Sequence, residues 1–258
     1  MSSLIRTLTT LAGCAALGTS VLMAATAARA DASGGERRFD LSGFDSIALD
    51  GSDDVVVRTG GRPGAIATGD PRALAALRLE VRDGVLHVGR LRGSWHDRGA
   101  IVTVTVPALK AVALAGSGNL DVGAVTAPAF EGRLSGSGDL RLGSLRARAA
   151  RFRLSGSGDV TLAGVSTETL ALGLVGSGDV RAAGQAGQVV IDVSGSGDVD
   201  AARLSARDVT IGVAGSGDVS ARASDRATIE ARGSGDVSVT GGARCIVAKH
   251  GSADVRCG

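Results

Sequence analysis

Seven aspartates recur at one place in a repeated five-residue motif, and their carboxylates are the first candidates for chemistry. The motif reads Gly-Ser-Gly-Asp and then an apolar residue, and its copies follow one another at steps of 18 to 20 residues. Residues that recur at such a period come to lie in a column when successive repeats stack as coils. The sequence therefore predicts a ladder of carboxylates formed by Asp139, Asp159, Asp179, Asp198, Asp218, Asp236 and Asp254.

Something must offset the charge of this ladder. Two carboxylates about 4.8 Å apart repel each other by about 1 kcal/mol in water. Backbone N–H groups of the turn are the favoured partners, helped by Arg141 and Arg181. Calcium is the alternative, although Gly- and Asp-rich calcium repeats use a period of about nine residues. We expect no cofactor, with Ca²⁺ held as the alternative at Asp139, Asp159, Asp179, Asp198, Asp218 and Asp236.

Two cysteines, Cys245 and Cys257, fall in the last repeat. In an exported protein a pair this close predicts a disulfide, which would stabilise the fold by ~3 kcal/mol in the chain-entropy model. Two reduced thiols are the alternative. A zinc site is less favoured, because His250 supplies only one further ligand and tetrahedral sites need four.

Enzymatic constellations are weak in this chain. His87, His96 and His250 lie in different segments, and none of the Ser-x-x-Lys, Gly-x-Ser-x-Gly or His-Glu-x-x-His patterns occurs. The one unusual polar cluster contains Trp95 and His96 in a loop, where they could contact a ligand or partner. Packing of this loop over the first coil is the favoured alternative.

Arginine-rich stretches at residues 146–148 and 151–153 could bind polyanions. Charged residues at alternating positions of a strand are more often a solvated face, so that reading is favoured here.

The elements that position these residues are strands. In Val189 to Val193 and in Val209 to Val213 every second residue is apolar, which is the period of a half-buried strand. We predict an all-β, single-stranded parallel β-helix with coils of about 20 residues and a right-handed turn. Each coil would contain a long strand, a glycine corner, a short strand and a linker such as residues 163–167, arranged as two or three flat faces.

The corner glycines are predicted to take positive φ and to let neighbouring coils approach closely. They are Gly136, Gly156, Gly176, Gly195, Gly215 and Gly233. With 40 Gly, 4 Phe and no Tyr in 258 residues, the core must consist of Val, Leu, Ile and Ala.

Residues 36–106 are less regular than the repeats of residues 107–258. Residues 51–55 are a degenerate first copy of the corner motif. The pattern then predicts a short helix after Asp70, a hairpin turning at Asp83-Gly84, and a strand over residues 101–106. We expect this part to be an insertion that caps the first coil.

The first thirty residues have the pattern of a signal peptide. Arg6 precedes an apolar stretch, and Ala28-Arg29-Ala30 fits a small-x-small cleavage site, which makes residues 31–258 the mature domain. A lipoprotein anchored through Cys14 is the alternative. The mature chain is formally neutral, with 26 basic and 26 acidic residues. We expect no nucleic acid partner and no transmembrane span in it.

The order of these segments resembles a known family. The run Phe39 to Ile47, the strand ending at Pro107, and the repeated Gly-Ser-Gly-Asp-Val are similar to the DUF2807 family, the head GIN domain of "putative auto-transporter adhesins". The resemblance covers nearly all of residues 36–258. It implies a β-helical fold on a secreted or envelope protein and carries no catalytic residues. An autotransporter also needs a C-terminal barrel of strands about ten residues long, which we do not expect here.

These observations favour a non-catalytic protein, exported to the periplasm or the cell exterior, that binds or scaffolds at the cell envelope. Its partner would be a protein or a glycan. The alternative is a carbohydrate-active β-helix enzyme of the polysaccharide lyase or hydrolase type.

Overall fold

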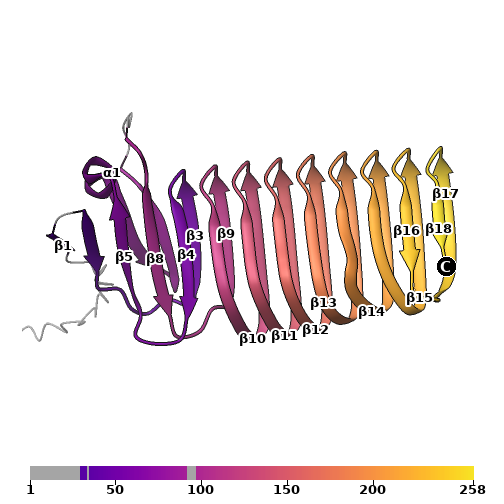
Figure 1. Ribbon diagram of the computed structural model, residues 1–258, viewed down its shortest axis with the longest axis horizontal. Helices are drawn as coiled ribbons and strands as arrows, with labels where there is room; N and C mark the ends of the chain where they lie inside the picture. Colours follow the sequence, from indigo (N-terminus) through magenta and orange to yellow (C-terminus); the bar gives the residue numbers. More distant parts are fainter. Residues whose placement is uncertain (1–29, 34, 92–96) are drawn as a thin grey trace, which may run out of the picture.

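A computed structural model describes residues 30–33, 35–91 and 97–258. The described chain is a rod of stacked β-coils, with the N-terminal layers at one end and the C-terminus at the other (Figure 1). The strands form one continuous network of hydrogen bonds, in which neighbouring coils pair in parallel. The predicted all-β solenoid with coils of about 20 residues is confirmed, and its right-handed turn stays a prediction.

Each regular coil is one long strand that runs from one corner to the next. The predicted division into two strands and a linker is wrong, because residues 163–167 lie inside a strand. Pairing with the neighbouring coil resumes within this bend, where Val165 is the partner of Leu145. The coils are β10 (Leu120–Gly136), β11 (Leu140–Gly156), β12 (Val160–Gly176), β13 (Val180–Gly195), β14 (Val199–Gly215) and β15 (Val219–Gly233).

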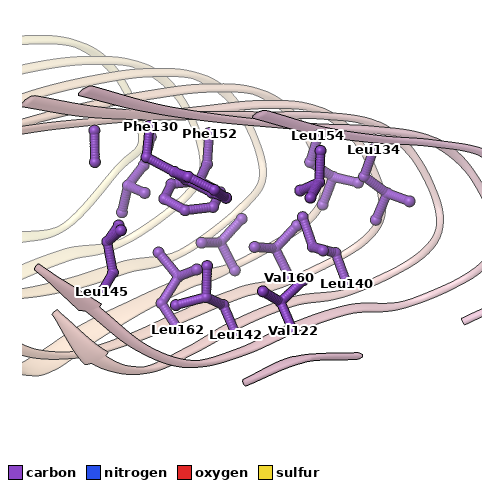
Figure 2. Close-up of a cluster of buried hydrophobic side chains, with 14 of the residues drawn as sticks. Val122, Phe130, Leu134, Leu140, Leu142, Leu145, Phe152, Leu154, Val160 and Leu162 are labelled. Carbon is purple, nitrogen blue, oxygen red and sulfur yellow. The ribbon is translucent and has the colours of Figure 1, made fainter. Parts of the chain in front are cut away.

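Each coil is flattened into two walls that meet at the glycine corner. Figure 2 shows the core between them, where Phe130 and Phe152 of one wall lie opposite Leu142 and Leu162 of the other. The two phenylalanine rings come from adjacent coils and pack at a tilt of 43°, with their centroids 5.7 Å apart. Buried and exposed residues alternate along the walls, so one side of every strand faces a dry core of Val, Leu, Ile, Ala and Phe.

A short segment closes the coil opposite the corner. In β11 this segment is residues 144–147, and its pairing with β10 is interrupted just before it, at Gly143, and just after it, at Arg148. We call the stacked segments of this kind the far edge, and the stacked Gly-Ser-Gly-Asp corners the corner edge.

The N-terminal part forms a cap whose strands do not stack in sequence order. Strands β7 and β8 make a coil that lies beneath the coil of β3 and β4, although they follow it in the chain. Antiparallel strands then continue the network outward from this coil. The elements are β1 (Ala30–Ser33), β2 (Glu36–Phe39), β3 (Ser46–Gly51), β4 (Asp54–Thr59), β5 (Gly64–Gly69), α1 (Pro71–Ala76), β6 (Leu77–Arg82), β7 (Val85–Arg90), β8 (Ala100–Val106) and β9 (Ala111–Gly116).

The short helix, the hairpin and the strand that the sequence predicts for the N-terminal part are all present. The side chain of Asp70 caps α1 by accepting a hydrogen bond from the Arg72 N–H, at 2.8 Å. Strands β6 and β7 form the hairpin, and Asp83 in its turn has a φ of 51°. The Gly51 corner stacks in register on Gly116, so the first copy of the motif is a true corner.

The last coil consists of β17 (Arg244–Gly251) and β18 (Val255–Cys257), stacked on β15 and on β16 (Val237–Thr240). Within the part of the chain that the structure describes, no helix has the length and apolar character needed to cross a membrane.

Candidate functional site

The corner edge is held by close contact between glycines of successive coils. The first glycine of each regular corner has a φ between 127° and 137°, as at Gly156 and Gly176. A Cβ atom built on Gly176 would overlap the carbonyl oxygen of Gly156. The predicted positive φ and close approach are confirmed, and both follow from the lack of a side chain.

The aspartate ladder is satisfied by hydrogen bonds between coils. The Oδ1 atom of Asp139 accepts from the backbone N–H of Asp159 at 3.1 Å, and Oδ1 of Asp159 accepts from that of Asp179 at 3.0 Å. The same bond recurs up to Asp254, with distances of 2.8 to 3.2 Å. The expectation of N–H donors is confirmed, but the expectation that they lie in the aspartate's own turn is wrong: the donor is the next aspartate's N–H.

Arginines bind the second oxygen at part of the ladder. Arg181 contacts Oδ2 of Asp159 at 3.1 Å and of Asp179 at 2.8 Å, while Arg141 contacts Oδ2 of Asp139 at 2.6 Å. The hydrogen bond that Arg181 donates to Asp159, with the negative charges of Asp159 and Asp179, raises the pKa of Arg181. These pairs are exposed, so each contributes little to stability. Among the described residues, the structure gives no ion pair to Asp198, Asp218 or Asp236.

The ladder geometry predicts which substitution it tolerates. Asn119 already occupies the ladder, and its Oδ1 accepts from Asp139 N–H at 3.2 Å. We therefore expect Asp179→Asn to leave the unfolding midpoint nearly unchanged, whereas Asp179→Ala should cost about 0.5–2 kcal/mol, as for a lost helix cap. Urea unfolding of both variants measures the difference. Equal losses in the two variants would contradict the assignment of Oδ1 as an acceptor.

The two cysteines close the last coil. The structure joins Cys245 of β17 to Cys257 of β18 by a disulfide, with their Cα atoms 6.5 Å apart. In the preceding coil their positions belong to Ala227 and Val239, which face the core. In the last coil the disulfide therefore takes the place of core side chains and joins one wall to the other.

We expect no titratable thiol in the denatured protein isolated from its native compartment. Cys245→Ser should lower the free energy of unfolding by about 3 kcal/mol, because the constraint on the unfolded chain is lost. A thiol assay in denaturant and urea unfolding are the measurements. Two titratable thiols per chain would overturn the bridge.

A buried ionic cluster joins the cap to the first corner, and sequence reasoning missed it. Arg90 donates to both carboxylate oxygens of Asp53, at 2.6 Å each, and to Oδ2 of Asp97 at 2.8 Å. The Asp53 side chain is 2% exposed and also accepts the N–H of Ala100. Hydrogen bonds to both carboxylates raise the pKa of Arg90. The available signal was Asp53 itself, which stands where the regular corners have their second glycine.

The cluster predicts acid sensitivity of the cap. The hydrogen bond from Arg90, with that from the N–H of Gly99, lowers the pKa of Asp97 below its unfolded value of about 3.9. This stabilisation is present above about pH 4 and is lost as the pH falls through the folded pKa. We expect Asp97→Asn to reduce the loss of thermal stability between pH 5 and the acid limit of folding. An unchanged pH profile would contradict this linkage.

The other sequence candidates do not converge. Trp95 and His96 lie outside the described residues. His87 lies in the cap, with its Nδ1 3.7 Å from Oδ2 of Asp50, and His250 lies in the last coil. Among the residues that the structure describes, no three His, Cys, Asp or Glu side chains form a group that could hold a metal ion.

A groove of about 770 Å³ runs along the far edge. Its floor consists of small side chains such as Ala186, Ala206 and Ala223. One of its sides is a row in register from β11 to β15, formed by Arg146, Ser166, Gln185, Ser205 and Arg222. The arginine-rich residues 146–148 stand out in the sequence. The sequence could not predict the groove, which forms only when five coils are stacked.

Comparison with solved structures supports the fold. A crystal structure of a "putative lipid binding protein" from Parabacteroides distasonis ATCC 8503 has a TM-score of 0.80 and 22% identity, covering 86% of this chain and 95% of that one. A "putative adhesin" from Parabacteroides merdae ATCC 43184 has a TM-score of 0.77 and 19% identity, with coverage of 86% and 94%. A search among curated proteins gave no match.

The family is shown by a match to a sequence model rather than by these distant structures. The model for DUF2807, described as "Putative auto-transporter adhesin, head GIN domain", matches residues 43–243, which include most of the cap, the corners up to Gly233 and the far edge. The chain belongs to the DUF2807 family.

Proposed function

We propose that this chain is a non-catalytic solenoid, exported to the cell envelope or surface, that binds or scaffolds there. One observation carries the proposal. The periodic array of carboxylates, the aspartate ladder, has its Oδ1 atoms bonded to the backbone of the next coil. These hydrogen bonds give the carboxylates a structural task between the coils, and that task supports a non-catalytic role.

The family description and the names of similar structures agree with an adhesin-like role. Export is supported by the signal-peptide pattern of residues 1–30 and by the disulfide, which persists in oxidising compartments. Lipidation of Cys14 stays the alternative mode of attachment.

The runner-up is a carbohydrate-active enzyme, and incubation with acidic polysaccharides separates the two. We expect the purified exported protein to release neither reducing ends nor unsaturated products from polygalacturonate or alginate, with and without added Ca²⁺. Activity that disappears on further purification would be assigned to a contaminating enzyme and not to this protein. Sustained turnover that is abolished by Asp198→Asn with Asp218→Asn would overturn the proposal and make the ladder catalytic.

A metal dependence of folding is tested separately. If the ladder is structural without metal, a chelator should leave the melting curve unchanged. A rise of the melting temperature with Ca²⁺, abolished by Asp179→Asn with Asp198→Asn, would make the ladder a cation site instead.

A further inference from the structure

We propose that the far-edge groove is the ligand site and that it binds a linear anionic polysaccharide along the axis of the rod. This inference rests on the proposed binding function and names the ligand class and the residues. The argument depends on the charge of the groove, its length and the polar groups between its arginines.

The groove presents unpaired positive charge. The structure gives Arg146 and Arg222 no carboxylate partner within the described residues, unlike Arg141 and Arg181 at the corner edge. Arg207, which is paired with Asp208 at 2.9 Å, and Glu168 also line the groove, so its lining carries three guanidinium groups and one carboxylate. Guanidinium groups form strong bidentate hydrogen bonds with carboxylates and sulfates. The far edge therefore suits an anion, whereas the corner edge displays the carboxylate ladder.

The groove is extended rather than a small-molecule pocket. Arg146 is on β11 and Arg222 is on β15, so four coil steps of ~4.8 Å put them roughly 19 Å apart along the rod. A single sugar acid cannot reach both guanidinium groups. A chain with repeated negative charges can contact both at once, and linking the contacts raises its affinity without any new interaction.

Hydroxyl and amide side chains fill the interval between the arginines. Ser166, Gln185 and Ser205 occupy successive coils in the same row. They offer both donors and acceptors, which match the alternating hydroxyls of a sugar chain. In the floor, Thr167 carries a buried Oγ1 that has no hydrogen-bond partner among the described residues.

Other polyanions fit less well. An extended peptide usually adds to a free strand edge, but at the groove each coil is already paired on both sides. Single-stranded nucleic acid binds on exposed aromatic platforms, and within the described residues every aromatic side chain is a buried phenylalanine. The floor of alanines also offers no deep apolar pocket for an anchoring side chain.

The test uses the purified exported protein and native electrophoresis in gels that contain a dissolved polymer. Polygalacturonate is the probe, dextran is the neutral control and polyglutamate is the peptide control. Arg146→Gln with Arg222→Gln removes the two unpaired charges of the groove. Arg58→Gln with Arg62→Gln is the matched control, because it removes two exposed arginines outside the groove.

We expect polygalacturonate, but not dextran, to retard the protein, with retardation falling as salt is raised. The groove variant should bind at least about tenfold more weakly, since each lost charged hydrogen bond is worth about a factor of ten. The control variant should bind like the parent, and monomeric galacturonate should not compete.

Equal loss in the two variants would overturn the groove as the site. Equal retardation by polyglutamate would overturn the polysaccharide specificity and favour an acidic protein, a second copy of this chain included. Absence of retardation overturns this inference alone, because export and the lack of turnover are measured independently.

Discussion

Gly176→Val is expected to lower the free energy of unfolding by about 2–5 kcal/mol. A β-branched residue is strained at the φ of 127° found there, at a cost of about 1–3 kcal/mol. Its Cβ would also overlap the backbone of Gly156 in the preceding coil, and overpacking adds a similar cost. Urea unfolding of the purified protein measures the change.

Gly173→Val in the same strand is the matched control. Gly173 is not among the glycines with a positive φ. A Cβ atom built on it would lie 3.9 Å from its nearest neighbours, which is an ordinary contact distance. We expect this variant to unfold near the parent midpoint. Similar losses at the two positions would contradict the assignment of the corner as the tight contact between coils.

Arg90→Met is expected to cost about 3–5 kcal/mol, because it leaves the buried carboxylate of Asp53 without its countercharge. Stability in a solenoid is carried by contacts between neighbouring coils, so the loss should concentrate in the cap. Limited proteolysis should therefore cut residues 60–106 before the regular coils. The measurement combines urea unfolding with mapping of the first cleavage sites.

Two further variants keep this prediction specific. Arg38→Met removes an exposed arginine paired with Glu36 and should cost less than about 1 kcal/mol. Adding Asp53→Asn to Arg90→Met should recover part of the loss, because the unpaired charge is gone. An equal loss in the free energy of unfolding for Arg90→Met and Arg38→Met would show that the buried cluster does not stabilise the cap.

The solenoid could be predicted because its two determinants are local and repeated. The step of about 20 residues sets the coil, and the alternation in segments such as residues 189–193 sets the strand. The positive φ of Gly176 could be predicted for the same reason, since the position recurs with glycine in every regular coil. Cys245 and Cys257 could be paired because both fall in one coil.

What could not be predicted depends on contacts between coils. The donor to Asp159 lies 20 residues on, in Asp179, and the local pattern favours a bond within one turn instead. The bend inside β12 has the composition of a linker because its residues are mostly small or polar, although Val165 to Thr167 are paired with the coils on both sides. The pairing of Asp53 with Arg90 requires β7 to fold back beneath β3, which nothing near either residue signals.

The central claim, that this is an exported envelope solenoid, is tested most directly by protease treatment of intact cells that carry a C-terminally tagged copy. We predict that protease removes the tag from intact cells, or after the outer envelope is opened, and that the mature protein begins at Asp31. A tag that stays protected until the cytoplasm is released, on a chain that still carries residues 1–30, would contradict the account.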